Sequence, residues 1–516
     1  MVVSRINIWR ILSPNKIYQK KYFSTAVKGP FNHIGGAKTA CLDAIRDVPV
    51  REPSTGNSLC NVPASGANEV DRAVTAASQA FRQWSKFSNS ERGRVLLSAG
   101  GKIRQYLEEI ARVEVRNTGK PIWEARLDIA SCADAFEYFG GIIASLAGQH
   151  IPLHNDTFAM VLREPLGVIA GIGAWNYPLQ SCSWKAAPAL ACGNTMVFKP
   201  SQFTPLTALM LADLLSESGV PEGVFNVIQG EETTGSLLCQ HPGIAKISFT
   251  GSVATGVKVM TAAAAGLKKV TLELGGKSPL IIFDDADMTN ALKGSLLANF
   301  LSQGEVCSNG TRVFVQETIA SQFLDKLVEA TKKLKIGDPY AEDTVVGATI
   351  SKEHAEKVLK YIEDAKKEGA KVMCGGERIH LPSPLDGGYY LSPCVLANCH
   401  DGMRVVQEEV FGAVLSFLTF STEEEVLKRA NDTMFGLAGG VFTRDLQRAI
   451  RVVHKLQAGT VWINNFNVVP LEIPFGGYKQ SGIGRENGTA ALDNYTQLKT
   501  VYVESGDVDC GPLLKD

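Results

Sequence analysis

Residues 166–173 have the sequence LGVIAGIG, and the run KVTLEL follows at residues 269–274. Between them, short β-branched runs alternate with longer helix-compatible stretches. The predicted strands are LGVIAGIG (166–173), TMVF (195–198), VFNVI (224–228), AKISF (245–249) and KVTLEL (269–274). The predicted helices are 181–191, a stretch that Thr204 caps, Pro205 starts and Gly219 ends, 232–240 and 253–266. This alternation predicts an α/β fold with a parallel, doubly wound sheet.

The pattern continues on both sides of this segment. Residues 67–84 form a predicted amphipathic helix, and we expect its apolar stripe to be core: Val70, Ala73, Ala77, Phe81 and Trp84. A second α/β region begins at SPLIIF (278–283) and ends at GTVWIN (459–464). The segments 150–163 and 496–503 alternate polar and apolar residues, which is typical of exposed or intersubunit strands.

Composition excludes several classes of function. The 516 residues are 45% hydrophobic and carry a net charge of −1, which gives no reason to expect nucleic acid or an anionic membrane as partner. No apolar run reaches the roughly 18 residues of a membrane span. The 11 cysteines include no CxxC pair, so neither a disulfide framework nor a zinc site is predicted. His150 and His154 are separated by Pro152, and we predict no metal there.

The N-terminus has a different composition from the rest of the chain. Residues 1–42 contain seven Lys or Arg and no acidic residue, and Val2, Ile6 and Trp9 have helical spacing. These features predict a mitochondrial transit peptide over residues 1–25 and therefore a location in the mitochondrial matrix. The alternative is a basic arm on a cytoplasmic protein.

Polar residues follow several of the predicted strands. Asn176 comes after the first strand, Lys199 after the second, Thr250–Ser252 after the fourth and Glu273 at the end of the fifth. In doubly wound sheets, ligands bind outside the carboxyl ends of the strands. The sequence therefore predicts a binding site that these residues share.

Cys307, in QGEVCSNG, is a potential nucleophile, and Glu273, earlier in the sequence, is a carboxylate that could act with it. A thiol can form a thioester, and a carboxylate can activate the water that hydrolyses it. Taken singly, each residue also fits a structural role, with the cysteine as packing and the glutamate as a surface carboxylate.

Six motifs occur in an order that resembles the aldehyde dehydrogenase superfamily from about residue 45 to 503. They are WNYP (175–178), FTGS (249–252), LELGGKSP (272–279), GEVCSNG (304–310), EEVFG (408–412) and PFGGYKQSGIGRENG (474–488). The resemblance implies a dinucleotide-binding domain, a catalytic domain and a small β oligomerisation arm, assembled as a homo-oligomer of two or four subunits. The corresponding residues are 30–148 with 165–275, 276–490, and 149–164 with 491–505.

The resemblance also implies catalytic roles. Cys307 attacks the aldehyde, and the Asn176 amide with the Cys307 backbone N–H holds the oxyanion. Hydride passes to NAD, and Glu273 activates the water that hydrolyses the thioester. An ordinary thiol has a pKa near ~8.5, so we expect a local depression of the Cys307 pKa.

For the cofactor NAD, the resemblance assigns Lys199 to the adenosine ribose, with Gln202 nearby, and Glu409 with Phe411 to the nicotinamide end. The GSVATG run opens a helix, so its backbone N–H groups and helix dipole suit the pyrophosphate. Its residues are Gly251, Ser252, Val253, Ala254, Thr255 and Gly256, and Thr250 just before them is a further cofactor-binding candidate.

Three positions depart from the family pattern. Glu305 stands where relatives more often have Gln, and we expect its charge to point away from the thiol. Ala413 replaces a proline. Gln202 replaces a glutamate that reads the ribose hydroxyls in NAD-preferring relatives, which weakens the expected rejection of NADP.

Within the superfamily, GIGAWNYP, SWKAAPALACGN and INNFNV look closest to the branch that oxidises 4-trimethylaminobutyraldehyde and betaine aldehyde, in carnitine-type or betaine-type metabolism. The family's substrate-tunnel positions are Tyr177, Trp184, Leu301 and Phe475 here. Aromatic faces attract a quaternary ammonium group, although Leu301 leaves the cage incomplete. Asp134 and Glu137 are either a negative tunnel mouth or a solvated face.

Three alternatives stay open. The first is a broad-specificity aliphatic aldehyde dehydrogenase with an ordinary apolar tunnel. The second is a CoA-acylating dehydrogenase, against which Glu273 argues. The third is a non-catalytic protein that binds NAD on the same scaffold.

Overall fold

The computed structural model describes residues 29, 31–154 and 156–513. The predicted transit peptide (1–25) lies outside the described residues and stays a prediction. In the part of the chain that is described, no helix is both long and apolar enough to cross a membrane.

The first sheet is the predicted doubly wound sheet. Its strand order is β2-β1-β9-β8-β7-β10-β11-β21. The strands are β1 (Asn32–Ile34), β2 (Ala37–Thr39), β7 (Val168–Ile172), β8 (Thr195–Lys199), β9 (Phe225–Val227), β10 (Ile244–Thr250), β11 (Lys269–Glu273) and β21 (Gly482–Ile483). From β9 to β11 the neighbouring strands are parallel, as predicted, and antiparallel strands close both edges.

Helices cover both faces of this sheet because its strands carry apolar side chains on both faces. Ile169 and Met196 face one layer of helices, whereas Val168 and Val197 face the other. The first layer contains α2 (Asn89–Gln105), α3 (Leu107–Thr118), α4 (Ile122–Ile142), α5 (Pro178–Ala191) and α6 (Leu206–Glu217). The second contains α1 (Ala67–Trp84), α7 (Glu232–Gln240) and α8 (Val253–Ala265).

Two local predictions need correction. Thr204 does not cap α6, because the N-cap residue is Pro205 and no side chain caps this helix. The Thr204 hydroxyl is instead buried without a hydrogen-bond partner among the described residues. Phe81 of the α1 stripe is only half-buried, whereas Val70 and Trp84 are core residues as expected.

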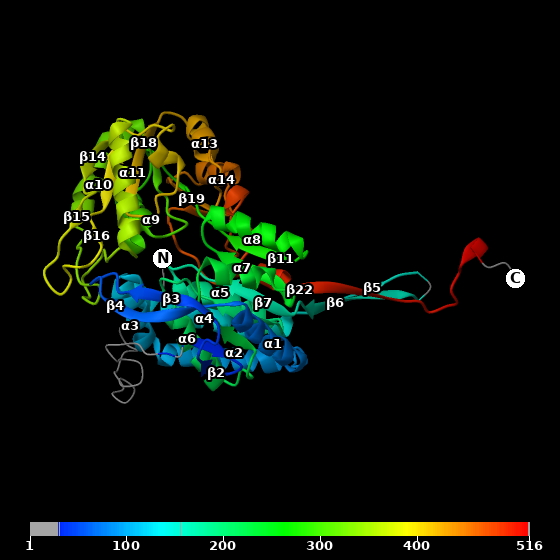
Figure 1. Ribbon diagram of the computed structural model, residues 1–516. Helices are drawn as coiled ribbons and strands as arrows, with labels where there is room; N and C mark the ends of the chain where they lie inside the picture. Colours follow the sequence, from blue (N-terminus) through cyan, green and yellow to red (C-terminus); the bar gives the residue numbers. More distant parts are fainter. Residues whose placement is uncertain (1–28, 30, 155, 514–516) are drawn as a thin grey trace.

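The second sheet has the order β14-β17-β18-β13-β12-β19-β20. The strands are β12 (Pro279–Ile282), β13 (Arg312–Gln316), β14 (Lys371–Cys374), β17 (Cys394–Ala397), β18 (Val414–Phe420), β19 (Ala438–Phe442) and β20 (Thr460–Ile463). Its helices are α9 (Met288–Phe300), α10 (Glu317–Lys332), α11 (Lys352–Lys367), α12 (Arg404–Gln407), α13 (Glu423–Asn431) and α14 (Leu446–Lys455). Figure 1 shows this region, in green to orange, above the first sheet.

The third sheet forms an arm that projects from the body of the molecule (Figure 1). It joins β5 (Gln149–Pro152), β6 (Phe158–Pro165) and β22 (Thr496–Val503), so segments far apart in the sequence lie side by side. Two small ribbons, a short helix and several 3₁₀ turns complete the fold: β3 (Ala44–Arg51), β4 (Ser58–Ser65), β15 (Arg378–Ile379), β16 (Tyr390–Leu391), α15 (Ala490–Asn494), and turns at Ile143–Ser145, Leu301–Gly304, Lys479–Ser481 and Gly511–Leu513.

Candidate active site

A cavity of about 500 Å³ lies at the carboxyl ends of β7, β8, β10 and β11. This is the edge at which the sequence predicted a binding site. The predicted site residues that line it are Asn176, Lys199, Gln202, Thr250, Gly251, Ser252, Thr255, Glu273, Cys307, Glu409 and Phe411. Because they come from both α/β regions, the fold has brought together side chains more than 200 residues apart.

The thiol of Cys307 follows the turn Leu301–Gly304 that ends α9. Its pKa is raised to about 12 by burial and by the nearby carboxyl groups of Glu273 and Glu409. The expected depression of this pKa was therefore wrong. The sequence placed Cys307 near a helix end but could not show that two carboxyl groups from distant segments disfavour the thiolate.

Asn176 lies beside the segment 301–307, which we name the nucleophile loop after its predicted nucleophile. Its side-chain Nδ2 donates a hydrogen bond to the backbone carbonyl of Glu305 at 2.9 Å, and the side chain is buried. An amide has two N–H donors, so one is used in this anchor and the second is free to act elsewhere. The amide is thereby fixed two residues away from Cys307.

Glu273 ends β11, lines the cavity and has a buried carboxyl group. Among the described residues, neither of its carboxyl oxygens has a hydrogen-bond partner. Burial, together with the negative charge of Glu486, raises its pKa well above the ordinary value. Such a carboxyl group holds a proton readily and can exchange it with a thiol or a water in the cavity.

The Glu486 carboxylate is itself bound to the Lys185 ammonium, and Lys185 also donates to the Thr250 hydroxyl at 2.6 Å. Lys185 and Glu486 are both buried, and neither was among the predicted site residues. Lys185 lies in α5 and Glu486 in the PFGGYKQSGIGRENG motif, so the motif was recognised while this contact was not.

A model of the aldehyde dehydrogenase family matches residues 42–501. The chain belongs to the aldehyde dehydrogenase family. It is 58% identical over 485 residues to the 4-trimethylaminobutyraldehyde dehydrogenase of Homo sapiens, which covers 94% of this chain and 98% of that protein. It is also 58% identical over 484 residues to 4-trimethylaminobutyraldehyde dehydrogenase A of Danio rerio, with 94% and 95% covered.

Solved structures with the same fold include complexes with NAD⁺. Betaine aldehyde dehydrogenase from Staphylococcus aureus in complex with NAD⁺ superposes with a TM-score of 0.91 at 38% identity, covering 96% of this chain and 98% of that chain. The NAD⁺ complex of aldehyde dehydrogenase from Bacillus cereus gives 0.89 at 40% identity, covering 92% and 96%. The fold and the enzyme class predicted from the motifs are thus confirmed.

In this dehydrogenase, one end of the cavity has the features of a dinucleotide site. Lys199 is buried with its pKa lowered to about 8, and its Nζ donates to the carbonyls of Pro200 and Gly230. Ser252 caps α8 by accepting from the Thr255 N–H at 3.3 Å. The cavity meets the start of α8 at Ser252 and Thr255, where the positive end of the helix dipole suits a phosphate group.

Three members of the predicted 250–256 run do not line the cavity: Val253, Ala254 and Gly256. Gly256 has a packing role, because a Cβ there would lie 2.6 Å from a methyl carbon of Leu274. Gln202 is half-buried at the same end of the cavity as Lys199.

Glu409 and Phe411 come from the second α/β region and also line the cavity. Glu409 accepts the Gly276 N–H at 2.9 Å, and burial raises its pKa to about 7. Phe411 has a left-handed backbone (φ +61°), and its carbonyl lies 2.7 Å from Nε2 of His354. His354 lines the cavity and contacts Trp175 edge to face, yet nothing in the sequence around it indicated a site.

The predicted substrate-tunnel residues lie outside this cavity. The Trp184 and Phe475 rings meet edge to face with centroids 5.7 Å apart, and Cys307 packs against the apolar cluster that contains both. The Tyr177 hydroxyl lies 3.1 Å from the Ser302 hydroxyl, and Leu301 is half-buried in the same turn.

The departures from the family pattern have structural explanations. Glu305 does not line the cavity; its buried carboxyl group accepts the Ile350 N–H at 3.0 Å. Ala413 is buried, and its carbonyl accepts the Cys394 N–H at 2.8 Å where β18 begins.

Asp134 and Glu137 both bind Arg104 on an exposed surface, which favours the solvated face over a negative tunnel mouth.

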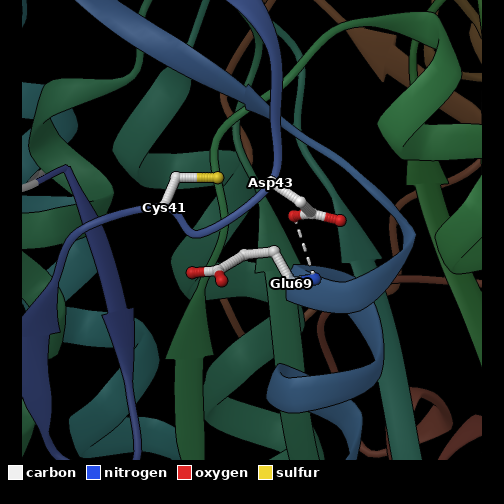
Figure 2. Close-up of side chains that lie close together, drawn as sticks. All are labelled: Cys41, Asp43 and Glu69. Atoms are coloured by element: carbon white, nitrogen blue, oxygen red, sulfur yellow. Dashed lines mark hydrogen bonds between the residues drawn. The ribbon is translucent and has the colours of Figure 1, made fainter.

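Among the described residues, one group of potential metal ligands occurs outside the cavity, at Cys41, Asp43 and Glu69 (Figure 2). The carboxylate of Asp43 accepts the N–H groups of Asn68 and Glu69 at the start of α1, and Glu69 accepts a hydrogen bond from Asn32 at 2.9 Å. Asp43 therefore caps α1, and the Glu69 side chain ties this helix to β1, so both carboxylates have structural roles. His150 and His154 are exposed in the arm.

Proposed function

We propose that this dehydrogenase oxidises an aldehyde to a carboxylic acid through a thioester on Cys307, with NAD as hydride acceptor. The observation that carries the proposal is the convergence of Cys307, Asn176 and Glu273 on one cavity whose far end suits a dinucleotide.

In the first step, the Cys307 sulfur forms a bond to the aldehyde carbon. The thiol proton passes to solvent, so the Glu273 carboxylate is left free to act in the last step. The aldehyde oxygen gains negative charge, which the second N–H of the Asn176 amide and the Cys307 backbone N–H stabilise.

The cavity residues fit NAD, which supplies the hydride acceptor when bound. Lys199 and Gln202 would hold the adenosine ribose, the start of α8 the pyrophosphate, and Glu409 the nicotinamide ribose, with Phe411 packed nearby. Because Gln202 is neutral, it rejects the extra phosphate of NADP less strongly than a glutamate would, and NAD remains the proposed cofactor.

In the last step, Glu273 takes a proton from water, the water oxygen bonds to the thioester carbon, and the carbon–sulfur bond breaks. The carboxylic acid leaves and Cys307 regains a proton. Glu273 is suited to this role because its carboxyl oxygens have no hydrogen-bond partner among the described residues. The same carboxyl group argues against CoA as the thioester acceptor.

The substrate we propose is 4-trimethylaminobutyraldehyde or a related aminoaldehyde, which places the enzyme in carnitine-type metabolism. Relatives with that name share 56–58% of residues over 94% of the chain. Tyr177, Trp184 and Phe475 supply aromatic faces for a quaternary ammonium group, whose attraction is worth about 2 kcal/mol when desolvated.

The test is NADH formation with 4-trimethylaminobutyraldehyde, betaine aldehyde and an uncharged aliphatic aldehyde of matched length. We expect kcat/KM to be at least about tenfold higher for a cationic substrate, or about 1.4 kcal/mol. Equal values would indicate a broad aliphatic aldehyde dehydrogenase, and no NADH from any aldehyde would indicate a non-catalytic protein.

We further propose a homo-oligomer of two or four subunits that the arm helps to assemble. Leu498 and Tyr502 of β22 are about 60% exposed on the arm, which a partner subunit would cover. Sedimentation of a Leu498→Asp, Tyr502→Asp variant should show smaller particles than wild type.

We also propose that residues 1–25 direct the protein to the mitochondrial matrix, because they are basic and carry no acidic residue. Fusion of this segment to a fluorescent protein tests the proposal, and a cytoplasmic signal would contradict it.

A further inference from the structure

We propose that Glu124 is a positioning residue that holds the nucleophile loop in its reactive conformation. The proposal rests on the role of Cys307 proposed above. Glu124 lies in α4, does not line the cavity and matches none of the motifs in the sequence.

The loop that leads to Cys307 has an unfavourable backbone. Ser302 (φ +46°), Gln303 (φ +55°) and Gly304 (φ +77°) are three consecutive left-handed residues, and the first two are not glycine. Such a run persists only where surrounding contacts hold it in place.

Glu124 makes the contacts that hold Ser302, the first of these three left-handed residues. Its carboxyl oxygens accept the Ser302 N–H at 2.9 and 3.1 Å, and one of them also accepts the Ser302 hydroxyl at 2.6 Å. Glu124 is 3% exposed, so solvent cannot replace it as the acceptor. Both donors of Ser302 thus depend on one carboxyl group.

The network continues to the predicted substrate side. Because the Ser302 hydroxyl donates to Glu124, it accepts from the Tyr177 hydroxyl at 3.1 Å. The Lys120 ammonium lies 3.9 Å from the centre of the Tyr177 ring and pairs with Asp128. Glu124 therefore links α4 to both the nucleophile loop and the residue that follows Asn176.

Two further anchors fix the rest of the loop. Gln303 binds the backbone of Gly347 and Ala348 through its amide, and the Glu305 carbonyl accepts the Asn176 amide. If Ser302 relaxes, the Glu305 carbonyl moves with the loop, so the Cys307 thiol and the Asn176 amide lose their relative placement. A misplacement of about 1 Å can lower a rate about 100-fold.

The test compares Glu124→Ala and Glu124→Gln with Glu69→Ala as a matched control. Glu69 is equally buried and also accepts a backbone N–H, but it lies at the start of α1, away from the loop. Ser302→Ala is a milder variant because it loses only the hydroxyl, and it provides a second test of the same contact.

For Glu124→Ala we expect kcat and the rate of Cys307 alkylation by iodoacetamide to fall about 100-fold, with Kd for NAD within about twofold of wild type. Glu124→Gln keeps an acceptor oxygen and should recover most of kcat. Ser302→Ala should lose activity in the same two readouts, and Glu69→Ala should keep wild-type values.

The inference is overturned if folded Glu124→Ala has wild-type kcat and a wild-type rate of Cys307 alkylation. If Glu124→Ala does not fold, the same result in Ser302→Ala overturns it. Equal losses in Glu69→Ala and Glu124→Ala would also overturn it, because a general loss of stability would then explain both. Cys307→Ala separates this failure from that of the proposed function: an active Cys307→Ala enzyme overturns the function itself.

Discussion

The side-chain amide of Asn176 donates a hydrogen bond to the backbone carbonyl of Glu305, 2.9 Å away and two residues before Cys307. This bond fixes one N–H of the amide, and the proposed mechanism assigns the second to the substrate oxygen. The proposed nucleophile and the proposed oxyanion donor are therefore positioned by one contact between two α/β regions.

Replacement of Asn176 by Ala removes both functions of the amide. We expect kcat to fall by about 100- to 1,000-fold, the usual loss for one oxyanion donor. Kd for NAD, measured by protein fluorescence, should stay near wild type, because Asn176 contacts the loop and not the dinucleotide end. A weakened Kd with unchanged kcat would assign Asn176 to cofactor binding instead.

The pH dependence of Cys307 alkylation should respond to Glu273. The negative charge of Glu273 raises the thiol pKa, so Glu273→Gln should lower that pKa and move the alkylation profile to lower pH. Below its pKa a thiol is alkylated faster as pH rises, so iodoacetamide labelling rates of both proteins at matched pH values, read by mass spectrometry of the Cys307 peptide, measure the shift. An unmoved profile would mean that the two groups do not interact.

Binding of NAD should depend on the ionisation of Glu409. Burial raises the pKa of this carboxyl group to about 7, so it is charged above that pH and neutral below it. A carboxylate accepts hydroxyl hydrogen bonds better than a carboxylic acid does. We expect Kd for NAD to rise as pH falls through 7 in wild type, and to show little pH dependence in Glu409→Gln.

The aromatic pair Trp184 and Phe475 should determine substrate preference. Trp184→Leu keeps an apolar side chain but removes the aromatic face, so kcat/KM for 4-trimethylaminobutyraldehyde should fall more than that for an uncharged aldehyde of matched length. The difference should be about tenfold. Parallel losses for both aldehydes would indicate that the pair acts only as an apolar wall.

Much of the first α/β region could be predicted from the sequence because its signals are local. The predicted helix 67–84 matches α1 (Ala67–Trp84) and 232–240 matches α7 (Glu232–Gln240). Periodicity within one element depends on neighbours along the chain, so it is visible without the fold. The position of the cavity followed from the rule on strand ends.

Contacts between distant segments could not be predicted in the same way. Glu124 binds Ser302 across 178 positions, and His354 binds Phe411 across 57. A buried glutamate in a mostly apolar helix carries no sequence signal of its partner. The error over the Cys307 pKa has the same origin, because the carboxyl groups that raise it come from β11 and from the EEVFG motif.

The measurement that tests the central claim most directly is the mass of the Cys307 peptide during turnover by Glu273→Gln. The variant is mixed with NAD and 4-trimethylaminobutyraldehyde, then quenched in acid. We predict a burst of NADH equal to the enzyme present and an acyl adduct on Cys307, because the thioester forms but is not hydrolysed. An unmodified Cys307 with steady turnover near the wild-type rate would contradict both the nucleophile and the role of Glu273.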